Sequence, residues 1–137
     1  MKNLLKLLLI MPISLVYAGT MYCPPSITCD YQKGSCDAGS GWLVDSWQAH
    51  KPFEGSKKIA LSKIWAYLQG TPGDKNAMYE IRCEYVYDTS SAPSSSIELY
   101  TYVYTQGLQG PGWKFSGFGN KNAECPGNDP EQCYGVR

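Results

Sequence analysis

One histidine, His50, is present in the chain, so any catalysis that needs an imidazole has to use it. Three charged residues alternate along a stretch with strand periodicity, which would place Glu80, Arg82 and Glu84 on one face of that strand. A nuclease-like site could draw its acid, its base and its phosphate clamp from these side chains together with His50. Glu80 and Glu84 could also serve as the two carboxylates of a glycoside hydrolase. A row of cross-strand ion pairs at the surface accounts for the same charges without chemistry, and we favour this interpretation.

Other marks of catalysis or of a bound cofactor are missing from the sequence. It contains no Gly-x-Ser-x-Gly nucleophile elbow and no Cys-x-x-Cys pair. His50 is not spaced as the partner of a second metal ligand. We therefore predict no metal and no cofactor, and we keep His50, Glu80 and Glu84 only as candidate catalytic residues.

Aromatic side chains are the more informative group, because they make up 13% of the chain. In one predicted strand Tyr100, Tyr102 and Tyr104 would project from a single face. Trp113 and Phe115 follow in a glycine-rich stretch. If exposed, these rings form a flat surface with polar hydroxyl groups, which suits a protein or a glycan partner. The alternative is that they fill the core, with Trp113 packing a tight turn.

Alternation of apolar and polar residues predicts strands through most of the chain. The two clearest are Tyr79–Tyr87 and Ile97–Thr105, and the serine-rich linker Asp88–Ser96 between them predicts a hairpin with a long loop. Shorter strands are expected at Gly41–Trp47 and Trp113–Phe118, where aromatic and β-branched residues gather.

The stretch Lys57–Leu68 is ambiguous. Its residues Ile59, Leu61, Trp65 and Tyr67 alternate as the apolar side of a strand would, whereas Ile64, Trp65 and Leu68 fit a helical stripe. The turn-forming Gly70–Asp74 after it favours the strand. The two ends of the chain, Met21–Ser40 and Asn120–Arg137, are rich in Gly, Pro, Cys and Asn, and we expect irregular segments pinned by disulfides. The predicted fold class is therefore mainly β: a small antiparallel sheet, sandwich or open barrel.

Cysteine usage predicts a disulfide framework. An even number of cysteines in a small exported domain is typical of paired sulfurs, here Cys23, Cys29, Cys36, Cys83, Cys125 and Cys133. Six cysteines allow 15 pairings, and the sequence does not choose among them. Short loops favour Cys29–Cys36 and Cys125–Cys133, which would leave Cys23–Cys83.

The N-terminus has the order of a secretory signal. Lysines precede an apolar run, and Val16-Tyr17-Ala18 ends in small residues at the positions that a signal peptidase reads. The run is about a dozen residues long, short of the ~20 that a membrane-spanning helix needs. We expect cleavage after Ala18, with residues 1–18 as signal peptide, no membrane anchor and residues 19–137 as one secreted domain in the periplasm or outside the cell.

Net charge argues against nucleic acid as a partner. The chain has 12 basic and 12 acidic residues, and removal of Lys2 and Lys6 with the signal leaves 10 − 12 = −2. A weakly acidic domain has no general attraction for phosphate backbones.

Several of these marks together resemble a known family. Cys23-Pro24 soon after the signal, Ile81-x-Cys83-x-Tyr85 in a central strand, and Trp113 before Cys125-x7-Cys133 resemble an uncharacterised family of small exported proteins of Gram-negative bacteria, including intracellular pathogens. Its members carry only a domain of unknown function. Cys29 and Cys36 do not belong to that pattern, so the N-terminal loop would be an elaboration. The resemblance implies export, to the extracellular space or a host compartment, and no particular activity.

These features rank the functions. First comes a secreted, effector-like virulence protein that binds a host or competitor protein without catalysis. A carbohydrate-binding module is the alternative, and a small secreted hydrolase or nuclease using His50 stands third. The predicted binding residues are Tyr100, Tyr102, Tyr104, Trp113 and Phe115. Partner identity and oligomeric state lie beyond the sequence.

Overall fold

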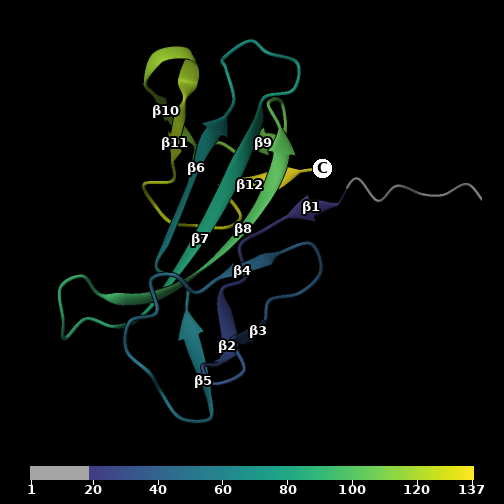
Figure 1. The fold of residues 1–137 in the computed structure, drawn as a ribbon. Helices are drawn as coiled ribbons and strands as arrows, with labels where there is room; N and C mark the ends of the chain where they lie inside the picture. The colour runs from purple at the N-terminus through teal and green to yellow at the C-terminus, as the bar shows by residue number, and fades with distance from the viewer. Residues whose placement is uncertain (1–18) are drawn as a thin grey trace, which may run out of the picture.

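The computed structural model describes residues 19–137, so the predicted signal peptide lies outside the described residues. Strands dominate this part of the chain, as predicted. The largest unit is an antiparallel sheet with strand order β10-β11-β6-β7-β8-β4 (Figure 1). Its strands are β4 (Leu43–Asp45), β6 (Lys63–Gln69), β7 (Met78–Asp88), β8 (Ser95–Tyr104), β10 (Lys114–Ser116) and β11 (Asn122–Glu124).

Period-two alternation sets the two faces of this six-stranded sheet. On β7 the side chains of Ile81, Cys83 and Tyr85 are at most 1% exposed and face the core. Their neighbours in sequence face the other way, which confirms the predicted alternation. β7 and β8 form the predicted hairpin, joined by the serine-rich segment, and a β-bulge lies between Val86 and Asp88.

Two small sheets complete the fold (Figure 1). One has the order β1-β12-β9, from β1 (Thr20–Met21), β9 (Leu108–Gln109) and β12 (Tyr134–Val136). The other has the order β3-β2-β5, from β2 (Ser26–Asp30), β3 (Ser35–Asp37) and β5 (Ser56–Ala60). Ile27 and Ile59, paired across the second small sheet, belong to the same buried cluster as the inner face of the six-stranded sheet. The architecture is therefore a mainly β domain with its core between the sheets.

Gly135 lets the sheet β1-β12-β9 lie close to the core. A Cβ atom at this position would overlap Ile81 and would lie 2.8 Å from Val103, two residues on the inner face of the six-stranded sheet. Met21 and Gly135 are register partners and face this core, so the alternate residues on the same strands face away from it.

Three disulfides cross-link the domain, with the pairing that loop length favours. They join Cys23 to Cys83, Cys29 to Cys36, and Cys125 to Cys133. The first ties the N-terminal segment to the central strand β7, and the second crosses the β2–β3 hairpin. The cysteine framework expected of an oxidising compartment is thus present.

The structure refines two expectations about the elements. Lys57–Leu68 is strand, as favoured, but it is divided between β5 and β6, which belong to different sheets. The chain ends are pinned by disulfides as expected, yet they are more regular than expected, since Met21–Ser40 contains β2 and β3 and Asn120–Arg137 contains β11 and β12.

Helix is nearly absent from residues 19–137, where the one helical element is the 3-10 turn η1 (Phe118–Asn120). No helix in this range is long and apolar enough to span a bilayer.

Candidate functional site

Polar and aromatic side chains gather on the face of the six-stranded sheet that points away from the core, which we call the outer face. The strand registers show which residues belong to the outer face, because residues paired across neighbouring strands point to the same side of the sheet. Its central members are Lys63, Trp65, Tyr67, Glu80, Arg82, Glu84, Glu98, Tyr100, Tyr102, Tyr104 and, at the β4 edge, Asp45.

Arg82 is the centre of the outer face. Its Nη1 atom donates to Asp45 Oδ2 and to Glu98 Oε2, each at 2.8 Å, and its Nε atom donates to Glu80 Oε2 at 3.1 Å. The guanidinium carbon lies 4.7 Å from the centroid of the Tyr100 ring, a cation–π distance. Three carboxylates and one ring therefore fix this arginine from several sides.

Register explains why these groups meet. Trp65, Arg82 and Tyr100 are partners across β6, β7 and β8. One step along the strands on the same face, Glu80 lies between the register positions of Tyr67 and Tyr102. Neighbouring side chains cover it so well that it is 2% exposed. Its ion pair with Arg82 satisfies the need of a buried carboxylate for a partner.

The pKa shifts are those of a fixed ion-pair network. Burial works to lower the pKa of Arg82, but hydrogen bonds to Asp45, Glu80 and Glu98 raise it above its ordinary value, so Arg82 stays charged. The hydrogen bond from Arg82 holds the pKa of Asp45 below its ordinary value. Burial raises the pKa of Glu98 despite the same arginine. The Glu80 carboxylate raises the pKa of the Tyr102 hydroxyl.

This geometry gives little support to the hydrolytic hypotheses. Arg82 is already bonded to three carboxylates, which leaves it poorly placed to clamp a phosphate. Glu80 and Glu84 are four residues apart on β7, so their backbones lie about 13 Å apart along the strand. Carboxylates of glycoside hydrolases are closer, at roughly 5–9.5 Å.

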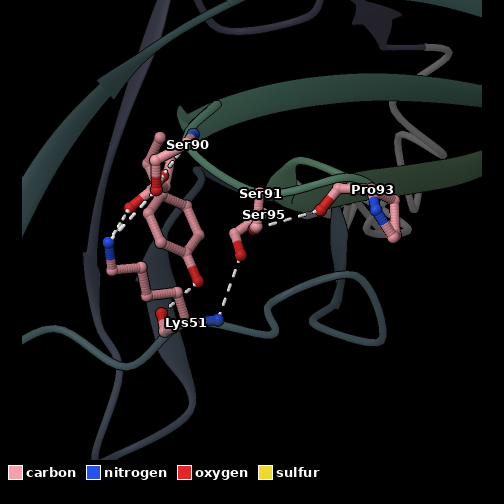
Figure 2. A network of polar contacts seen from close by, with 7 residues as sticks. Lys51, Ser90, Ser91, Pro93 and Ser95 are labelled. Carbon is pink, nitrogen blue, oxygen red and sulfur yellow. Dashed lines mark hydrogen bonds and ion pairs between the residues drawn. The ribbon is translucent and has the colours of Figure 1, made fainter.

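His50 directly precedes Lys51, which lies against the loop that joins β7 and β8 (Figure 2). The Lys51 backbone N–H donates to Ser95 Oγ at 3.0 Å, and its Nζ atom is 2.7 Å from Asp88 Oδ2. Asp88 is eight residues beyond Glu80 on β7, or about 26 Å along the strand. The structure therefore does not bring His50 and Glu80 together.

The five predicted binding residues divide between two surfaces. Tyr102 is 37% exposed and Tyr104 is 63% exposed on the outer face, where Tyr100 is half-buried against Arg82. Trp113 is packed in the core, and its Nε1–H donates to the Tyr134 carbonyl at 3.2 Å. Phe115 is exposed at the edge of the inner face, with its ring 6.2 Å from that of Tyr79. Trp113 is therefore a packing residue, as in the alternative interpretation of the sequence, and is not an exposed binding residue. Phe115 is not part of the outer face.

Sequence reasoning missed four members of the outer face. Trp65 and Tyr67 were expected on the apolar side of their strand, whereas Ile64, Ala66 and Leu68 hold that side. No pattern in the sequence indicated that Asp45 and Glu98 would form ion pairs with Arg82. The period-two pattern around Glu98 showed which face it takes, but no local pattern shows that β4 pairs with β8.

Comparisons with known proteins leave the outer face without a precedent. No protein-family model matches the chain, and the searches of curated proteins and of solved structures find no significant match. The function of this face therefore has to be inferred from its own residues.

Proposed function

We propose that the mature domain is exported and acts by binding a protein partner through its outer face, without catalysis. The observation that carries the proposal is the cluster of Arg82 with Tyr100 and Tyr102 at the middle of an extended sheet face. Aromatic residues and arginine are the types most enriched at the energetic centres of protein interfaces.

Exposure is highest along one border of the cluster. Tyr102 and Tyr104 are successive outer-face residues of β8. On β4, the register partner of Tyr100 is Leu43, which is 52% exposed. Tyrosine offers a large contact area at low conformational entropy cost because it has two side-chain torsions. A partner that covers these side chains would exclude water from Arg82 and its carboxylates.

Rigidity also suits binding. The rings of Tyr100 and Tyr102 meet edge to face with centroids 6.0 Å apart, and Tyr100 is held by Arg82. A surface already fixed in place loses little freedom on association, which leaves more of the contact energy for affinity.

Charge indicates the kind of partner surface. Acidic side chains outnumber basic ones at the middle of the outer face, where Asp45, Glu80, Glu84 and Glu98 surround Arg82 and Lys63. Complementary potentials favour encounter and register. The proposed partner therefore presents a basic patch with an apolar centre.

Export and the effector role rest on other observations. The signal-like N-terminus predicts cleavage after Ala18, and three disulfides are typical of proteins that mature in an oxidising compartment. The resemblance to small exported proteins of Gram-negative bacteria adds a host or competitor protein as the partner. Intact-mass measurement of the exported protein should give a chain that begins at Gly19 with no free thiols.

The binding proposal is tested with the oxidised domain, residues 19–137, immobilised and exposed to extracts of candidate target cells. A captured protein is then purified and its dissociation constant measured against variants. Tyr102→Ala should weaken binding by about tenfold or more, as expected of a hot-spot residue, and added salt should weaken it further. Phe118→Ala is the matched control, because Phe118 is 90% exposed but lies outside the outer face.

Two results would contradict the proposal. One is a partner whose affinity survives both Tyr100→Ala and Tyr102→Ala. The other is an enzymatic activity of the domain that disappears on His50→Ala, which would restore the hydrolase alternative.

A further inference from the structure

A groove of about 760 Å³ lies beside the sheet β1-β12-β9 and shares Tyr104 with the outer face described above. Its volume falls within the roughly 300–1,000 Å³ typical of small-ligand sites. Its lining comes from β1 and Tyr22 after it, from β12, from the end of β8 and the segment up to β9, and from the connection between β6 and β7. Figure 1 shows β1, β9, β12 and the end of β8 at one side of the molecule.

The register of the small sheet builds the floor of the groove. Thr20 pairs with Val136, and Tyr134 pairs with Gln109. Because Met21 and Gly135 face the core, these alternate residues face outward together. A sheet of very short strands thus presents a mixed aromatic and polar surface to solvent.

Tyr22 and Tyr134 bring two aromatic rings to the groove, tilted by 41° to one another. Their ring centroids are 4.8 Å apart, and Tyr22 is 46% exposed. Tyr104, the most exposed tyrosine of β8, also lines the groove. Aromatic faces of this kind stack against the apolar C–H faces of sugar rings while their hydroxyl groups stay available for hydrogen bonds.

The hydroxyl groups of Tyr22, Tyr104 and Tyr134 differ from those of several other tyrosines in their hydrogen bonding. Other tyrosines donate to backbone carbonyls inside the protein: Tyr31, Tyr79, Tyr85 and Tyr87. Within residues 19–137, no such bond ties the hydroxyls of Tyr22, Tyr104 and Tyr134. They remain available as donors and acceptors for a ligand.

Polar groups between the rings are already oriented. Gln109 Nε2 donates to the Gln106 carbonyl at 2.9 Å, and Thr105 Oγ1 lies 3.2 Å from Gln106 Oε1. Both amide side chains keep further donor and acceptor capacity toward the groove. Amides fixed next to aromatic planes match the many hydroxyl groups of a saccharide.

Charge narrows the class of ligand. Lys75 is the one charged side chain among the described residues that line the groove, and Arg137 lines an adjacent hollow that Tyr104 shares. A cationic ligand would meet no carboxylate here, whereas an anionic group would find Lys75. We propose that this groove binds an oligosaccharide that carries a carboxylate, as uronic and sialic acids do.

The test uses the oxidised domain and defined probes. Oligogalacturonates and sialyllactose are titrated calorimetrically, with methyl-esterified oligogalacturonates and lactose as the neutral counterparts. We expect saturable binding of at least one acidic probe, weakened about tenfold or more by Tyr22→Ala. Lys75→Gln should weaken the acidic probe to the level of its neutral counterpart.

Trp47→Ala is the matched control, because Trp47 is 78% exposed and does not line the groove. Thermal unfolding of every variant verifies that the fold is kept. Binding of neutral probes alone, no binding of any acidic probe, or binding that survives Tyr22→Ala together with Lys75→Gln would overturn the proposal. None of these results bears on the protein partner, because Tyr22 and Lys75 lie outside the outer face.

Discussion

Arg82 divides its guanidinium among carboxylates whose surroundings differ. Asp45 lies on the edge strand β4, and about a third of its side chain is exposed, whereas the side chain of Glu98 is 14% exposed. The exposed carboxylate loses little hydration when it pairs with the arginine, so the pairing lowers the pKa of Asp45. Burial and the neighbouring carboxylates of Glu84 and Asp45 raise the pKa of Glu98 instead. Two partners of one arginine should therefore act on stability with opposite signs.

Substitution of each carboxylate by its amide should reveal this. Asp45, with a lowered pKa, stabilises the fold above about pH 4 and loses this contribution as the pH falls through its folded-state pKa. Asp45→Asn should therefore lower the free energy of unfolding at pH 7 by about 0.5–1 kcal/mol, discounted for solvent screening, and the difference from the parent protein should shrink as the pH falls through the folded-state pKa of Asp45.

Glu98 carries the opposite linkage. With a raised pKa, its charged form costs stability as the pH rises above about 4.5, so Glu98→Gln should leave the free energy of unfolding at pH 7 unchanged or slightly higher. Denaturant titrations of both variants from pH 2 to 8 check the pair of signs. An equal loss for both at pH 7 would show that the two carboxylates are equivalent.

The sheet β1-β12-β9 packs on the core through a close approach at Gly135. Gly135 allows the strand β12 to approach Ile81 and Val103 so closely that no side chain fits between them. The same close approach also positions Tyr22 and Tyr134 in the groove, because both side chains lie on the outward side of this small sheet.

Gly135→Ala should therefore destabilise the fold by about 1–3 kcal/mol, the range for an overpacked core, and should weaken ligand binding in the groove. Gly127→Ala is the matched control, because a Cβ atom there has no neighbour within 4 Å. Denaturant unfolding of the two variants measures the difference. Equal stability of the two would mean that β12 can move away from Ile81 at no cost.

Element-level prediction succeeded where alternation is unbroken and failed where it changes phase. On β7 and β8 the pattern runs through each strand, so the two faces could be assigned from the sequence. Between β5 and β6 the buried positions move from Ile59 to Ile64, an odd step. A change of phase exchanges the two faces of a strand, which is why Trp65 and Tyr67 were placed on the wrong side.

For the molecule as a whole, the sequence predicted local features better than long-range ones. The three tyrosines of β8 were predicted to share one face of their strand, and they lie together on the outer face. The contact of Asp45 with Arg82 joins residues 37 apart through the pairing of β4 with β8. The groove combines segments that are far apart in sequence, among them Tyr22, Lys75 and Tyr134. Such contacts depend on tertiary arrangement, which period and spacing do not encode.

The long disulfide should contribute the most to the stability of the whole domain. Cys23 and Cys83 are 60 residues apart, whereas the other two bridges span 7 and 8 residues. In the chain-entropy model, closing the long loop restricts the unfolded chain by about 4 kcal/mol and closing a short one by about 2.5 kcal/mol. Replacing both cysteines of each bridge by alanine, one bridge at a time, should show this order in the free energy of unfolding.

Removal of the Cys23–Cys83 bridge should also affect the groove, because Tyr22 directly precedes Cys23 and this bridge fixes that segment to β7. The Cys29→Ala/Cys36→Ala variant is the control, since that bridge joins adjacent strands of the other small sheet. Amide hydrogen exchange of β1 and denaturant unfolding measure the two effects. A larger loss of stability from the Cys29–Cys36 bridge would mean that the two small sheets, rather than the link from the N-terminus to β7, limit the stability of the domain.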